Sequence, residues 1–213
     1  MPPVVHVYPL SRLVHAPASR WESLLKSIEE GKTRAFRYYL PLREAVVLFC
    51  SKGGKDRDQI VSGMVARARS AGGSRGAKVA KDNDDAFRVF ESSFYPRIKA
   101  YKGDFLRESQ TGHPFEGVTL VGSPHFEVLD QGGADRYVFL YPAGWERDEI
   151  NAYLELLSII VQKRFGKPPE SLWCMNLRTG RDEKWKSSAR VRKRCENAAR
   201  LYARLINAME SEP

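Results

Sequence analysis

Three residues of types that can bind a metal ion or transfer a proton, His125, Glu127 and Asp130, lie in one short stretch, PHFEVLD. The alternation of apolar and polar residues there predicts a β-strand. Because strand side chains alternate between two faces, His125 and Glu127 point the same way. An imidazole beside a carboxylate can bind a transition metal, or act as a base with its orienting group. The sequence favours the simpler interpretation, in which these are ordinary polar residues of a partly exposed strand.

Basic residues are concentrated towards the C-terminal end of the chain. The sequence has 213 residues and a net charge of +9, and the segment from Arg178 to Arg204 carries ten basic and three acidic residues. Such a segment is either the solvated face of a helix or a surface that binds phosphates. The candidate nucleic-acid contacts are seven of its cations: Arg178, Arg181, Lys184, Lys186, Arg190, Lys193 and Arg194.

Several classes of protein are disfavoured by composition. Three cysteines far apart, Cys50, Cys174 and Cys195, are typical of reduced thiols in a cytoplasm and not of a disulfide framework. No apolar run approaches the roughly 20 residues that cross a bilayer, and the start MPPVVHVYPLSRLVH lacks the apolar stretch of a signal peptide. Zinc-site and phosphate-loop spacings are absent as well. We expect a cytoplasmic protein with no membrane partner.

Residues 1–82 are expected to form an N-terminal part made of a short strand or extended arm and helices. Ser19 and Glu22 form a capping box that predicts a helix up to Glu30, EAVVLFC (residues 44–50) predicts a buried strand, and residues 60–71 predict a second helix ending at Gly72. The stretch GGSRGAKVAKDND (residues 72–84) is interpreted as a mobile basic linker. It is either a disordered surface loop or an arm that orders on a partner through Arg75, Lys78 and Lys81.

Residues 83–209 alternate regularly between helix and strand patterns. Asp82 or Asn83 is expected to cap a helix with an aromatic stripe, followed by strands at VTLVG, PHFEVLD and DRYVFLYP. A helix over residues 145–166, a strand at SLWCMNL and a helix over residues 186–208 complete the order. We therefore predict one domain over residues 1–213 of mixed α/β (α+β) class, with helices flanking a central mixed sheet.

The order of these elements, with the motifs FEGVTLVGSPHFEV, RYVFLYP, INAYLELL and CMNLRTGR, resembles the PD-(D/E)XK nuclease superfamily, and especially its RecB-like branch. The resemblance covers about residues 83–205 and implies a restriction-endonuclease-like αβββαβα core. It also implies strand carboxylates that hold Mg²⁺ or Mn²⁺ beside a lysine, so that the ion activates water against a phosphodiester. Some RecB-like exonucleases add an iron–sulfur cluster held by four thiolates, whereas this chain has three cysteines.

The places of those catalytic residues hold other side chains in this sequence. His125 occupies the motif position of the aspartate, Phe139 the position of the second acidic residue, and Tyr141 the position of the lysine. Imidazole is a poor ligand for Mg²⁺, so we expect a cleft lined by aromatic rings that holds no cofactor. The leading interpretation is a catalytically inactive nuclease-like protein. It would bind nucleic acid, DNA above all, or serve as an assembly subunit in prokaryotic DNA processing or defence.

Two alternatives stay open. One is an active metal-dependent DNA nuclease with a displaced site at His125, Glu127 and Asp130, using Mg²⁺ or Mn²⁺. The other is a protein–protein interaction module whose partner carries the chemistry. An exposed apolar patch formed by the tryptophans Trp145, Trp173 and Trp185 would favour this second alternative.

Overall fold

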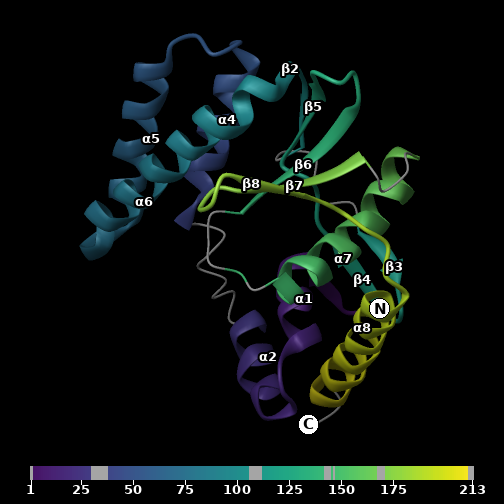
Figure 1. The fold of residues 1–213 in the computed structure, drawn as a ribbon. Helices are drawn as coiled ribbons and strands as arrows, with labels where there is room; N and C mark the ends of the chain where they lie inside the picture. The colour runs from purple at the N-terminus through teal and green to yellow at the C-terminus, as the bar shows by residue number, and fades with distance from the viewer. Residues whose placement is uncertain are drawn as a thin grey trace.

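The computed structural model describes residues 2–29, 38–105, 112–141, 145, 147–166 and 171–210. Within these ranges, seven α-helices and two mixed β-sheets form the mixed α/β fold that the sequence predicts (Figure 1). None of the described helices is both long enough and apolar enough to cross a membrane.

The larger sheet has five strands in the order β2-β5-β6-β7-β8. β5 pairs antiparallel with both β2 and β6, and helix α7 then connects β6 to β7, which lies parallel to β6. The turn between β5 and β6 falls at Gly132 and Gly133 as predicted, and Gly133 adopts a left-handed φ of 80° that suits glycine. The elements are β2 Ile98–Asp104, β5 Phe126–Asp130, β6 Asp135–Tyr141, α7 Arg147–Phe165, β7 Leu172–Asn176 and β8 Arg181–Lys184.

The smaller sheet contains β1 (Val4–His6), β4 (Val118–Val121) and β3 (His113–Phe115), in the order β1-β4-β3. The three predicted strands are present as β4, β5 and β6, but their placement in one central sheet is wrong, because β4 pairs with β1 and β3 and not with β5. Sequence patterns also missed β2, β3 and β8. β2 and β8 lie at the edges of their sheet and expose polar side chains, so neither shows a buried apolar alternation.

The larger sheet separates two clusters of buried side chains. Tyr137, Phe139 and Tyr141 of β6 pack on one face, together with residues of α7, α1 (Val7–His15) and α8 (Ala189–Glu210). Val138 and Leu140 pack on the opposite face. They join residues of α4 (Leu40–Ser51) and α5 (Arg57–Ala71) and the aromatic stripe Phe87, Phe90 and Phe94, which is buried as predicted. The two expected parts, residues 1–82 and 83–209, both contribute side chains to each cluster.

Helix α4 (Leu40–Ser51) replaces the strand predicted at residues 44–50. The run EAVVLFC is buried almost all round, and a short buried apolar run does not distinguish a strand from a helix. Pro41 lies in the first turn of α4, where a missing N–H costs nothing. The short strand predicted at the N-terminus is present as β1, but it ends at His6, and the unpredicted helix α1 begins at Val7.

The segment interpreted as a mobile linker, residues 72–84, is helical instead. α5 (Arg57–Ala71) ends as predicted at Gly72, and a 3₁₀ turn at Gly73–Arg75 leads into α6 (Gly76–Val89). The two helices pack against each other as a hairpin, which is visible at the edge of the fold in Figure 1. A π-turn at Phe90–Phe94 continues α6, and a 3₁₀ turn at Tyr95–Arg97 precedes β2.

Asn83 does not cap a helix of its own, because it is fully buried inside α6. Its Oδ1 accepts a hydrogen bond from the backbone N–H of Leu42 at 3.0 Å. Its Nδ2 donates to the carbonyls of Tyr38 at 3.0 Å and Val79 at 2.8 Å. The side chain therefore satisfies a free N–H in the first turn of α4 and fastens that turn to α6.

The remaining elements largely follow the sequence. α2 (Trp21–Glu29) matches the first predicted helix, whose expected end at Glu30 and Gly31 lies outside the described residues. α7 ends at Phe165 before Gly166, which has a left-handed φ of 61°, and β7 is buried on both faces as predicted.

We predict that Asn83→Ala lowers the free energy of unfolding by about 2 to 3 kcal/mol, because it leaves buried backbone groups without partners. Asp85→Ala is the matched control, since Asp85 pairs with Lys81 on the exposed side of the same helix and exposed pairs contribute less than about 1 kcal/mol. Urea unfolding of both variants measures the difference. Equal losses would contradict the role given to Asn83.

Candidate nucleic-acid interface

His125 is a buried histidine with contacts at both ring nitrogens. It lies just before β5 and is 5% exposed. Nδ1 accepts a hydrogen bond from the backbone N–H of Leu140 at 3.0 Å, and Arg43 Nη1 lies 3.0 Å from Nε2. Burial, and then the neighbouring Arg43 cation, hold the pKa of His125 well below its usual value. The neutral ring connects β6 to α4, which suits a structural residue.

Asp130 belongs to the turn that joins β5 to β6. Its Oδ1 accepts a hydrogen bond from the N–H of Ala134 and its Oδ2 accepts one from Arg136 Nε, both at 2.9 Å. Burial alone would raise the pKa of Asp130, but these hydrogen bonds and the Arg136 charge lower it by more. Asp130 therefore stays ionised and holds the hairpin together.

The three candidate residues do not form a ligand set. Glu127 lies within β5, opposite Tyr137 of β6, while His125 and Asp130 have the contacts just described. Across the described parts of the chain, no group of three or more His, Cys, Asp or Glu side chains is placed to hold a metal ion. Asp148, an acid that follows β6 in the sequence, lies on α7, where its Oδ2 is 3.9 Å from His15 Nδ1.

The aromatic face of β6 is part of the core, so the expectation of a ring-lined cleft is wrong. Tyr137, Phe139 and Tyr141 are buried. Phe139 stacks on Tyr153 of α7 with ring centroids 4.1 Å apart and an interplanar angle of 20°. Tyr141 accepts a hydrogen bond from Asn176 Nδ2 at 2.8 Å. Helix α7 therefore covers the face of β6 on which the resemblance would place a metal ion.

The tryptophans do not form the exposed patch that would favour a protein-interaction module. Trp173 is buried in the sheet and donates to Asp182 through Nε1. Trp145 and Trp185 are partly buried and pack against the core cluster of α7. All three contribute to the packing of the core.

Glu155 is a residue that sequence patterns missed. It lies within the apolar helix α7, is 4% exposed, and accepts hydrogen bonds from Trp185 Nε1 at 3.1 Å and Arg192 Nη1 at 3.4 Å. Burial raises the pKa of Glu155, although these two donors counteract the effect. The contacts attach the connection after β8 and the first turns of α8 to α7. The position of this acidic residue inside the apolar run LELL was the one feature of the sequence that could have indicated its buried role.

The seven candidate phosphate contacts fall into two groups. The first, which we call the tip group, contains Arg178 in the turn after β7, Arg181 and Lys184 on β8, and Lys186 just beyond. The second, the α8 group, contains Arg190, Lys193 and Arg194, whose spacing places them on one side of α8. Figure 1 shows the turn between β7 and β8 beside α6 and the α8 helix in another part of the fold.

The seven cations share one electrostatic property. Within the described residues, none of them makes an ion pair with a carboxylate, whereas Arg192 and Arg200 of α8 pair with Glu155, Glu196 and Glu116. Their positive charges are therefore not neutralised by a direct ion pair, although Asp182 and Glu183 lie between Arg181 and Lys184 on β8.

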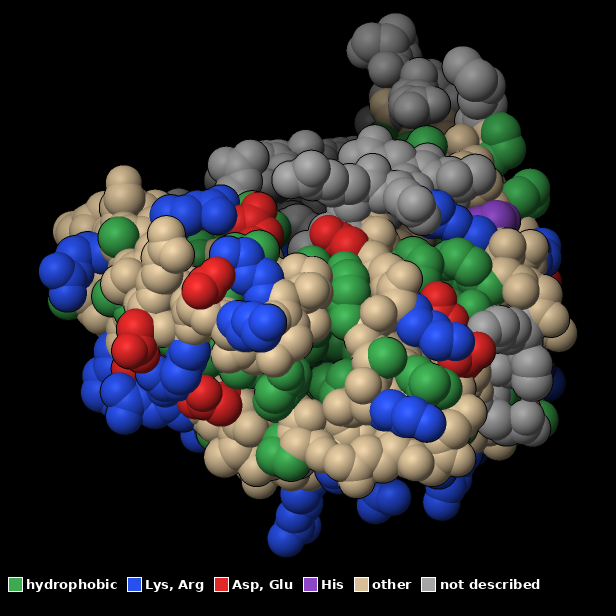
Figure 2. Space-filling model, turned by 90° about the horizontal axis from the view of Figure 1, so that it is seen from above, with side chains coloured by type: hydrophobic (Ala, Val, Ile, Leu, Met, Phe, Trp, Pro, Cys, Tyr) green, Lys and Arg blue, Asp and Glu red, His purple; other side chains and the backbone are tan. Residues whose placement is uncertain are grey.

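The basic residues of α6 are different. Lys78 lies 3.6 Å from Asp82, and Lys81 lies 2.6 Å from Asp85. Figure 2 shows basic side chains gathered along the edge where Figure 1 places α5 and α6, with acidic side chains between them. Arg75 lies in the 3₁₀ turn before α6, so these three residues are on an ordered hairpin and not on a mobile arm.

In comparisons with known proteins, the chain matches no family model, no curated protein and no solved structure. The resemblance to the PD-(D/E)XK superfamily therefore stays a prediction that rests on the sequence motifs.

We predict that His125 makes the stability of the protein fall below about pH 6.5. The unfolded histidine binds a proton near pH 6.5 while the native ring stays neutral, so the native state loses stability progressively as the pH falls below that value. His125→Asn keeps an acceptor for Leu140 and removes this contribution.

Urea unfolding of the protein and of His125→Asn between pH 5 and pH 7.5 tests this. The difference between the two proteins isolates His125, because both keep His6, His15 and His113. Parallel stability curves would show that the ring is not held neutral.

Proposed function

We propose that this chain is a nucleic-acid-binding protein with a nuclease-like arrangement of elements and no nuclease chemistry. The observation that carries the proposal is the set of seven cations of the tip group and the α8 group, which have no acidic partner among the described residues. The tip group and the α8 group are two separate basic surfaces, and a long polyanion such as a nucleic acid could contact both of them. DNA processing or defence is the setting that the sequence resemblance suggests.

Binding through these groups would be electrostatic and largely independent of base sequence. Each lysine or arginine that neutralises a phosphate releases condensed counterions, so affinity falls steeply as salt rises. Phosphate contacts position a protein on nucleic acid without reading its sequence. The protein would therefore attract nucleic acid, while any specificity would come from a partner or from a separate site.

The packing of β6 supports the part of the proposal that assigns no nuclease activity to the protein. Phe139 and Tyr141 supply neither a carboxylate nor an ammonium group, and both are buried under α7. His125 has its ring nitrogens against Leu140 and Arg43, so a metal ion would have to displace those contacts. The contacts of His125 disfavour the displaced nuclease site as well.

We predict that neutralising the α8 group, by Arg190→Gln, Lys193→Gln and Arg194→Gln together, weakens binding to duplexes of unrelated sequence by similar factors. The slope of log K against log salt should fall by about 2 to 3, because about three phosphate contacts are lost. Fluorescence anisotropy across a salt series measures both quantities.

The matched control neutralises three exposed cations that already have acidic partners. These are Lys52, Arg67 and Lys102, which pair with Asp56, Glu44 and Asp135. The control carries the same change in net charge and should retain most of the slope. If both triple variants bind alike, net charge and not the α8 group accounts for binding.

We also predict that single- and double-stranded DNA stay intact when incubated with the purified protein in Mg²⁺ or Mn²⁺. Gel analysis of labelled strands measures this, with Glu127→Ala and His125→Ala as parallel samples. Cleavage that depends on either residue would replace the proposal with an active, displaced nuclease site.

A further inference from the structure

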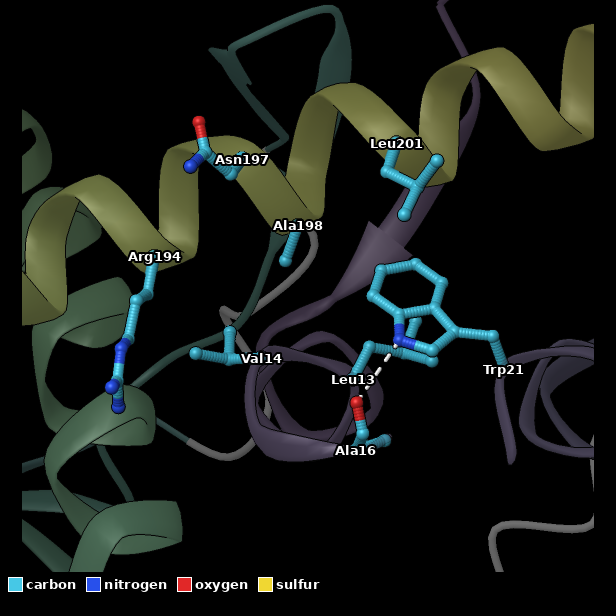
Figure 3. Close-up of a pocket in the computed structure, with 8 residues that line it drawn as sticks. All are labelled: Leu13, Val14, Ala16, Trp21, Arg194, Asn197, Ala198 and Leu201. Atoms are coloured by element: carbon cyan, nitrogen blue, oxygen red, sulfur yellow. Dashed lines mark hydrogen bonds between the residues drawn. The ribbon is translucent and has the colours of Figure 1, made fainter. Parts of the chain in front are cut away.

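A shallow groove lies between α1, the start of α2 and α8 (Figure 3). Its volume is about 200 Å³. Pockets for drug-sized ligands begin near roughly 300 Å³, so this groove accepts about one ring system. The lining residues are Leu13, Val14, Ala16, Trp21, Arg194, Asn197, Ala198 and Leu201.

The groove is apolar along its length and has an indole at one end and a guanidinium at the other. Figure 3 shows Leu201 and Ala198 on the α8 side, Val14 and Leu13 on the α1 side, and Trp21 at the end below Leu201. The indole is held in place because Trp21 Nε1 donates to the carbonyl of Ala16 at 3.2 Å. Leu201 is 42% exposed, so an apolar wall stands open to solvent.

Arg194 crosses from α8 past Val14 and closes the opposite end of the groove. Its charge reaches His15, whose pKa is lowered by burial first and by Arg194 as well, while Asp148 and Glu149 of α7 act in the opposite direction. Because the acids of α7 oppose the charge of Arg194, the attraction for an anion depends on Arg194 together with Arg190 and Lys193 of α8. Asn197 is directed along the helix, where its Oδ1 accepts a hydrogen bond from Arg200 Nη1.

The row of cations on α8 begins at this end of the groove. Arg190 lies one turn before Arg194, which is about 6 Å along the helix axis, and Lys193 lies beside them. That spacing is close to the separation of neighbouring phosphates along an extended strand. A ring that stacks on Trp21 would thus be connected to an anion at Arg194 and to further anions at Lys193 and Arg190.

We propose that this groove receives one unpaired base of a single-stranded nucleic acid. The base stacks against Trp21 between Leu201 and Val14, its phosphate binds Arg194, and the adjoining phosphates bind Lys193 and Arg190. The inference rests on the proposed function and adds to it a preference for single strands. A duplex keeps its bases stacked inside the helix, so it contacts the cations and leaves the groove empty.

The test compares a labelled thymidine strand of about ten nucleotides, within the usual site size of single-strand binders, with an abasic strand of the same length and charge. The thymidine strand should bind about tenfold more tightly, since stacking of a base on an aromatic ring is worth about that much. Leu201→Gln should remove most of this advantage. It should leave the affinity for the abasic strand unchanged, because no charge is altered.

Leu48→Gln is the matched control, because Leu48 is 44% exposed on α4, outside the groove. A second pair of variants uses the indole: Trp21→Phe should retain the thymidine preference and Trp21→Leu should lose it. Circular dichroism checks that each variant is folded.

The outcomes separate the two proposals. If neither strand binds at low salt, the proposed function fails and the inference fails with it. If both strands bind equally, or if Leu201→Gln behaves like Leu48→Gln, the inference is overturned while the proposed function stands. If an acidic peptide carrying one phenylalanine binds more tightly than the thymidine strand and depends on Leu201, the groove is a protein-docking site and the inference is also overturned.

Discussion

The packing of the aromatic face of β6 against α7 is the constraint on which the rest of the structure depends. Strand alternation sends Tyr137, Phe139 and Tyr141 to one side, and the stack of Phe139 on Tyr153 holds α7 against the sheet. Buried aromatic side chains contribute large apolar areas and specific ring geometry. The same packing fills this face of β6 with side chains of α7, so our proposal places phosphates on the outer surface.

Helix α7 also determines where the basic surface lies. Glu155 reaches out of its apolar run to hold Trp185 and Arg192, which fixes the first turns of α8. A buried carboxylate is costly unless it is hydrogen-bonded or paired, so these contacts specify one position for α8. Arg190 and Arg194 flank the fixed turn and remain available to solvent. In this way the acid stabilises the placement of the cations without contacting a ligand.

Sequence patterns predicted the elements with strong periodicity or clear ends. The ranges of α7, β7, β5 and β6 followed from apolar stripes and from glycine turns such as Gly133. The patterns failed where burial from other elements decided the outcome. α4 looked like a strand because α5, α6 and the sheet bury it on most sides. Residues 72–84 looked mobile because the anchor of α6, Asn83, bonds to residues about 40 positions away.

The candidate site was predictable in part. The cations from Arg178 to Arg194 were visible in the sequence as a charge run, but their division into two groups depends on the turn after β7 and on the position of α8. His125 and Asp130 suggested chemistry because of their residue types, and their burial and hydrogen bonds could only come from the structure. The groove at Trp21 could not be predicted, because α1, α2 and α8 come from opposite ends of the chain.

The most direct measurement is a map of backbone amide NMR shifts on addition of a short oligonucleotide to the protein. We expect the shifted signals to lie in α8 from Arg190 to Leu201 and around the turn from Arg178 to Lys184, with the strand from Tyr137 to Tyr141 unaffected. Shifts centred on His125, Glu127 and Tyr141 would contradict the proposed function. They would place the bound oligonucleotide on the face of β6 that α7 covers.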